Sequence, residues 1–216
     1  ATPLIEFESY IEKYYPDFTV ILKRYGSVQI RNVATVAGNI ATASPIGDTL
    51  PLLLSLDAKV VLRSIKKTQI IPLNDFFIDY RKTKLQKGQF IDSIRIPLFP
   101  KNIFKAYKIS KRFDDDISSV CASFNLEVIN KKIKNIRVAY GGMASIPKRA
   151  KYCEKILLNS SITEQIINKA KEALEKDFKP INDMRASGKY RMEVAKNLLR
   201  KCFLEIEQKK LIRVNN

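Results

Sequence analysis

The sequence of 216 residues predicts an α+β protein, in which short helices and strands precede an antiparallel sheet packed with helices. Three observations support this class. Apolar residues recur at helical spacing near the N-terminus, they alternate with polar residues over 119–129, and helical spacing returns twice after residue 160. A break in periodicity at "PLFPKN" (97–102) predicts two domains, residues 1–100 and 101–216.

The first domain is expected to combine two short helices with a few strands. Asp48 is predicted to cap a further helix that runs through Leu56 and tolerates Pro51 in its first turn. The segment before it, residues 30–51, is interpreted as turns and short extended pieces. The other predicted elements are helices over 4–14 and around 18–25, a hairpin from 58–64 and 68–73, and a strand over 89–97.

The second domain is expected to hold a three-stranded antiparallel sheet with one covered face, followed by two helices. The strict alternation of residues 119–129 carries this prediction. Ser161 and Glu164 have the spacing of a capping box for the first helix. The predicted strands are 104–110, 119–129 and 133–140, and the predicted helices are 162–174 and about 190–208.

Composition excludes several classes of function. The sequence has no histidine and only three scattered cysteines, which disfavours a metal site and a disulfide framework. The longest apolar run is far too short to cross a bilayer, and no signal peptide is visible, so we expect a cytoplasmic protein without a membrane partner. The net charge of +17 comes mostly from lysines spread along the whole chain, and we therefore expect no nucleic-acid partner. A basic nucleic-acid binder stays a weaker alternative, and it would show strong salt dependence.

One stretch, "IRNVATVAGNIATASPIGDTLP" (30–51), has the residue types of a ligand loop. Gly38 and Gly47 permit close approach to the main chain, and short hydroxyl and amide side chains supply hydrogen bonds suited to a diphosphate. Asp48 offers an acceptor for a sugar hydroxyl. The alternative is a set of ordinary tight turns whose Asn and Ser side chains bond to their own backbone.

This stretch resembles a flavin-contacting segment of the xanthine dehydrogenase family, whose usual form is close to IRN-x-A-T-x-GGN-x-x-x-ASPIGD-x-x-P. Three later stretches agree in order and spacing: "YRKT" (80–83), "YKISKRFDDDIS" (107–118) and "AYGGMA" (139–144). The chain is similar to the small subunit of bacterial xanthine dehydrogenase and to the flavoprotein subunit of carbon monoxide dehydrogenase. The resemblance implies that residues 1–100 are the second lobe of an FAD-binding domain and that residues 101–216 are the flavoprotein C-terminal domain.

The resemblance also implies a cofactor, partners and a set of contacts. In this family electrons pass from a molybdenum centre through two iron–sulfur clusters to FAD and then to NAD, and the flavin carries the chemistry. The acidic loop 114–116 matches a segment that influences reactivity toward NAD. No residue is expected to be catalytic or to bind metal. The implied FAD-binding residues are Tyr25, Thr35, Val36, Ala37, Gly38, Asn39, Asp48, Ile91 and Lys108.

Several of these positions also have a simpler interpretation. Lys108 taken alone reads as a solvated lysine on a strand, Tyr25 as core filling, residues 114–116 as a loop-forming charge run, and Gly141-Gly142 as a strand-ending turn with no ligand.

The sequence departs from the family pattern in two places. Ala37 stands where the family usually has a glycine, so its methyl group either crowds the diphosphate or is accommodated at a negative φ. No glycine-rich loop of the LVAGGTDL type is found, and three explanations stay open: that FAD lobe was lost in evolution, was removed in cloning, or is supplied by another chain. Two hypotheses follow: part of a xanthine dehydrogenase-like oxidoreductase that is not active alone, or a truncated remnant or interaction module that binds no flavin.

Overall fold

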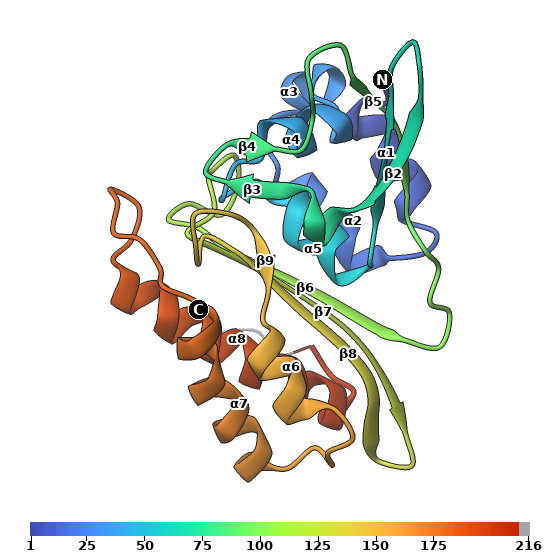
Figure 1. Ribbon diagram of the computed structural model, residues 1–216. Coiled ribbons are helices and arrows are strands. Elements are labelled where there is room, and N and C mark those ends of the chain that lie inside the picture. Colours follow the sequence, from blue (N-terminus) through green and yellow to red (C-terminus); the bar gives the residue numbers. More distant parts are fainter. Residues whose placement is uncertain (212–216) are drawn as a thin grey trace.

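The computed structural model describes residues 1–211 and has an α+β architecture in three layers (Figure 1). Short helices and a small sheet form the N-terminal layer, a long antiparallel sheet lies in the middle, and the C-terminal helices cover its other face. Among residues 1–211, no helix is long and apolar enough to span a membrane. The division into two domains at residue 100 stays a prediction. The last five residues of the predicted second domain, 212–216, lie outside the described part of the chain.

The N-terminal layer contains five helices and three pairs of neighbouring strands. The order β2-β1-β5 confirms the predicted hairpin, with β5 added on the other side of β1. The helices are α1 (Leu4–Ile11), α2 (Pro16–Lys23), α3 (Val28–Val33), α4 (Val36–Thr42) and α5 (Thr49–Ser55). The strands are β1 (Lys59–Arg63), β2 (Thr68–Pro72), β3 (Phe77–Asp79), β4 (Lys82–Thr83) and β5 (Phe90–Arg95), with a single 3-10 turn at Leu73–Asp75.

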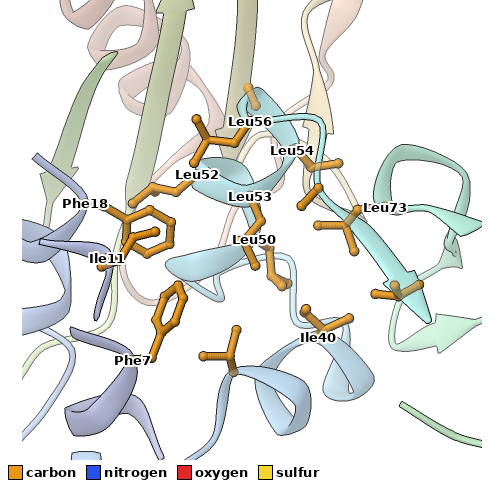
Figure 2. Packing of buried hydrophobic residues seen from close by; sticks show 14 of the residues in the cluster. Phe7, Ile11, Phe18, Ile40, Leu50, Leu52, Leu53, Leu54, Leu56 and Leu73 are labelled. Atoms are coloured by element: carbon orange, nitrogen blue, oxygen red, sulfur yellow. The ribbon is translucent and has the colours of Figure 1, made fainter. Parts of the chain in front are cut away.

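Helix α5 is the centre of this layer, because all seven of its residues are buried. Figure 2 shows its leucines packed between Phe7 and Phe18 on one side and Ile40 and Leu73 on the other. Pro51 is accommodated in the first turn, as predicted, because the first N–H groups of a helix have no intrahelical partner.

The interpretation of residues 30–51 as turns and extended pieces is wrong, because α3 and α4 occupy much of this stretch. Each helix begins with a hydroxyl cap: Ser27 accepts a hydrogen bond from the Ile30 N–H, and Thr35 accepts one from the Gly38 N–H. Such caps stabilise helix ends by about 1 kcal/mol, which helps such short helices to form. Ala43 ends α4 in the left-handed region at a φ of 48°.

The central sheet has four strands rather than the predicted three, in the order β6-β7-β8-β9. The fourth is short and pairs with the end of β8, so the sequence shows no alternation to reveal it. The strands are β6 (Ile103–Ile109), β7 (Val120–Ile129), β8 (Lys132–Gly141) and β9 (Lys148–Arg149), and the helices that follow are α6 (Lys151–Leu157), α7 (Glu164–Asp177) and α8 (Gly188–Gln208).

The prediction of one covered face is also wrong, because both faces of β7 are buried. Val120, Phe124 and neighbouring apolar residues face the C-terminal helices, as the alternation predicted. On the opposite face Ser123 shares a hydrogen bond with Ser55 of α5 at 2.6 Å, and Asn125 donates to the Ser55 carbonyl at 3.0 Å. These polar residues are buried because α5 supplies their partners.

Two predicted helix caps differ in the structure. Thr163, rather than Ser161, caps α7 by accepting from the Ile166 N–H, while Ser161 forms a β-bridge with Lys132. Asp48 stands at the N-cap of α5 as predicted, but its carboxylate makes no capping hydrogen bond. It is directed instead to residues of the central sheet.

Candidate functional site

A cavity of about 650 Å³ lies where the N-terminal helices meet the end of β6 and the loop after it. Six of the nine site residues expected from the sequence line it: Tyr25, Thr35, Gly38, Asn39, Asp48 and Lys108. The remaining lining comes from Gly26, Ile30, Val33, Ala34, Thr42, Ser44, Ile46, Gly47, Asp115, Asp116 and Ile117. We call this space the first cavity.

The first turn of α4 gives the first cavity an open stretch of main chain. A Cβ atom added at Gly38 would meet only the Thr35 Oγ1 atom, at 3.0 Å, and nothing else within 4 Å. Gly38 is also exposed. Any larger side chain there would therefore project into the space that a ligand needs.

Asn39 connects α4 to the residues on either side of the first cavity. Its Nδ2 donates to the Tyr25 hydroxyl at 2.9 Å, and its Oδ1 accepts from Thr49. Burial, with a smaller contribution from the Asp48 charge, raises the pKa of Tyr25, so the phenol is neutral near pH 7. Tyr25 packs against the apolar core and lines the cavity as well.

Asp48 and Lys108 form a buried ion pair at the wall of the first cavity. The Lys108 Nζ atom lies 2.7 Å from the Asp48 carboxylate and also donates to the Arg24 carbonyl at 2.9 Å. The two side chains are 1% and 5% exposed, which excludes the interpretation of Lys108 as a solvated lysine. Burial raises the pKa of Asp48, although Lys108 and a hydrogen bond from the Ser118 hydroxyl both favour the charged form.

Arg24 holds the loop after β6 in place, and the sequence analysis missed it. Its guanidinium donates to the carbonyl oxygens of Phe113 and Lys108 at 2.8 and 3.0 Å and lies over the Phe113 ring. Asp116 in the same loop accepts from the backbone N–H of Arg112 and Ile117, so part of the acidic run does form the loop. Arg24 directly precedes Tyr25, and this adjacency in the sequence is the signal that could have identified Arg24 as a site residue.

The other three predicted residues do not line the first cavity. Val36, Ala37 and Ile91 line a second cavity of about 680 Å³, bounded by residues of the N-terminus and of the free edge strand β5. Residues 35–39 contribute to both cavities and therefore form the ridge between them. Ala37 is helical and does not have a positive φ, so its backbone does not require glycine.

Two families of known proteins match the chain in sequence order. The family described as the FAD binding domain in molybdopterin dehydrogenase matches residues 1–99, and the CO dehydrogenase flavoprotein C-terminal domain matches residues 105–206. The chain belongs to this flavoprotein family. It is an FAD-binding part of the xanthine dehydrogenase and CO dehydrogenase family of molybdenum hydroxylases, and its cofactor is FAD.

Individual relatives support the same family, and a solved structure shares the fold. The chain is 37% identical over 161 residues to "Xanthine dehydrogenase" of Emericella nidulans, covering 73% of this chain and 12% of that protein. It is 26% identical over 206 residues to "Xanthine dehydrogenase FAD-binding subunit" of Escherichia coli, covering 94% of this chain and 70% of that protein. The carbon monoxide dehydrogenase structure from Hydrogenophaga pseudoflava matches with a TM-score of 0.87 at 22% identity, over 92% of this chain and 70% of that one. The chain thus spans only about an eighth of the length of the fungal relative.

The residues that line the two cavities fit part of a dinucleotide cofactor. The first cavity has the size of a small-molecule site, and its wall combines an open glycine backbone, a half-buried tyrosine and fixed polar groups. The second cavity, across the ridge, has space for a further part of an extended ligand.

Proposed function

We propose that this FAD-binding domain holds its cofactor across both cavities, with the diphosphate over the ridge formed by residues 35–39. The observation that carries the proposal is the position of this ridge. Thr35, Gly38 and Asn39 face the first cavity, whereas Val36 and Ala37 face the second. An extended dinucleotide laid across the ridge would contact all nine predicted residues, which a ligand confined to either cavity would not.

Each wall residue has a separate task in this proposal. Gly38 leaves room for the diphosphate, and Asn39 orients Tyr25 beside the flavin end through its 2.9 Å hydrogen bond. Lys108 neutralises Asp48, so that a polar group of FAD meets a fixed and nearly neutral wall. Ile91 supplies an apolar contact in the second cavity.

We further propose that FAD in this chain passes electrons within a xanthine dehydrogenase-like complex and delivers them to NAD. The partners would be iron–sulfur and molybdenum-cofactor subunits or domains, together with a glycine-rich FAD lobe. The names of the relatives support the oxidoreductase, and the position of Asp115 and Asp116 at the first cavity supports an acidic loop beside the flavin. FAD, when bound, supplies the hydride and electron transfer.

A titration of FAD into the purified chain, followed by flavin fluorescence, tests the cofactor site. We expect saturable binding, with at least tenfold weaker affinity in Gly38→Leu because the leucine fills the first cavity. Leucine favours helix over glycine by about 0.5–1 kcal/mol, so a loss of folding does not explain a loss of binding. Asn32→Leu, at an exposed position of α3 outside the lining, is the control and should bind like the wild type.

The opposite results identify which part of the proposal fails. Equal affinity of Gly38→Leu and Asn32→Leu would show that FAD does not occupy the first cavity. No saturable binding by the wild type at high micromolar FAD would show that the chain is a half-site that needs the glycine-rich lobe, or an interaction module that binds no flavin. Rapid mixing of the FAD-loaded chain with NADH tests the acceptor, because loss of the oxidised-flavin absorbance is expected if NAD is the partner.

A further inference from the structure

The C-terminal helix α8, which lies across the central sheet from the N-terminal helices (Figure 1), carries a fully buried arginine, Arg191. Burying a guanidinium costs several kcal/mol unless it is well paired, so its partners indicate its role. Arg191 donates to the carbonyl oxygen of Ser119, lies 3.4 Å from the carbonyl oxygen of Gly142, and pairs with the Asp183 carboxylate at 2.7 Å.

The first backbone partner is directly linked to the wall of the first cavity. Ser119 follows Ser118, whose hydroxyl donates to the Asp48 carboxylate. The Ser119 N–H donates to the Ile109 carbonyl at 2.8 Å, which fixes the return of the loop onto β6. Arg191 therefore anchors the peptide that follows Ser119, one residue beyond the Ser118 side chain that bonds Asp48.

The second backbone partner, Gly142, is hydrogen-bonded to the segment 44–48, which also lines the first cavity. The Gly142 N–H donates to the Pro45 carbonyl at 2.7 Å, and residues 44 and 46–48 line the first cavity. Gly142 has a φ of 82°, and an added Cβ would lie 2.2 Å from the Ser119 carbonyl oxygen and 2.9 Å from Arg191. Only glycine lets these three backbone and side-chain groups meet.

We propose that Arg191 is a positioning residue for the FAD site: from α8 it fixes segments 44–48 and 110–119, and through Ser118 it sets the orientation of Asp48. This inference rests on the proposed function, because it assigns to α8 a role in holding the cofactor that the first cavity is proposed to bind. The guanidinium itself does not touch the cofactor. Its effect on FAD passes through two hydrogen-bonded peptides.

Hydrogen–deuterium exchange of the chain without FAD tests the positioning itself. Arg191→Met should raise amide exchange in segments 44–48 and 110–119, because it removes the donor that ties both peptides to α8. Arg200→Met is the matched control, since Arg200 lies on the same helix, is 48% exposed and pairs with Glu164 of α7 at 3.2 Å. Unchanged exchange in both segments of a folded Arg191→Met protein would overturn the proposal.

FAD titrations then test whether the positioning reaches the cofactor. The dissociation constant should rise about tenfold in Arg191→Met, the effect of one charge-assisted hydrogen bond, and less in Arg191→Lys. In a Ser118→Ala background, Arg191→Met should raise the dissociation constant by a smaller factor, because the hydrogen bond from Ser118 to Asp48 is already absent. The same factor in both backgrounds, or no change in either, would overturn the proposal. If Arg191→Met does not fold, Arg191→Lys carries both measurements.

These results separate the inference from the proposed function. A wild-type chain that does not bind FAD would contradict a site that suffices without the glycine-rich lobe, while the exchange data would still decide whether Arg191 fixes the two segments. A wild-type chain that binds FAD, with affinity unaffected by Arg191→Met, would contradict only the inference.

Discussion

Substitution of Gly142 by alanine tests how tightly the C-terminal domain is joined to the cavity wall. The glycine has a φ of 82°, which costs a residue with a Cβ roughly 1–2 kcal/mol. The added methyl group would also lie 2.2 Å from the Ser119 carbonyl oxygen, so that peptide must shift and lose its hydrogen bond from Arg191. A hydrogen bond from a charged group contributes about 1.5–3 kcal/mol, so the free energy of unfolding should fall by about 2.5–5 kcal/mol in total.

Gly88 provides a matched control for this substitution. It has nearly the same φ, 80°, but an added Cβ would meet nothing within 4 Å. Gly88→Ala should therefore lose only the backbone cost of roughly 1–2 kcal/mol. Urea unfolding of both variants measures the difference. Equal free energies of unfolding for the two variants would refute the argument that the close contact at Gly142 joins α8 to the wall of the first cavity.

Three further predictions concern stability. Lys108→Met should lower the free energy of unfolding by about 3–5 kcal/mol, because it leaves Asp48 buried without its partner. The double variant Lys108→Met/Asp48→Asn should lower it by less, and urea unfolding of both variants measures the difference. Leu53→Ala should lower the free energy of unfolding by about 2–5 kcal/mol, whereas Ile65→Ala, at an exposed position, should lower it by less than about 0.5 kcal/mol. Equal losses in thermal or urea unfolding would contradict the assigned core. Burial acts to raise the pKa of Asp183, but hydrogen bonds from two backbone N–H groups and an arginine lower it below 3.8 overall, so this carboxylate stabilises the fold above that pH. Its advantage over Asp183→Asn should shrink as the pH falls through the lowered value, and a constant difference from pH 6 to 2 would contradict this.

The elements that the sequence predicted well are those with long and regular patterns. Strand β7 and helix α8 have enough residues for alternation or helical spacing to be unambiguous, and both were confirmed within two residues. Helices α3 and α4 were missed because they have only six and seven residues and contain asparagine, threonine and glycine, which favour helix weakly. Their hydroxyl caps were the local signal that could have revealed them.

The second covered face of the sheet could not be predicted from local pattern. Ser123 and Asn125 look like solvent-facing residues, but α5, about 70 positions earlier in the chain, packs over them and forms hydrogen bonds with both. The same limit applies to the candidate site. Its residues follow from the family resemblance, but the division between two cavities depends on how α4 meets the edge strand β5.

The measurement that tests the central claim most directly is a ¹H–¹⁵N correlation spectrum of the chain with increasing FAD. We predict saturable shifts of the amides of Tyr25, Ala37 and Gly38 and of their neighbours in both cavities, with little change in α6 and α7. With a net charge of +17, nonspecific attraction of an anionic cofactor would instead shift many exposed lysines without saturation. That pattern, or shifts confined to one cavity, would contradict a site in which FAD lies across the ridge at residues 35–39.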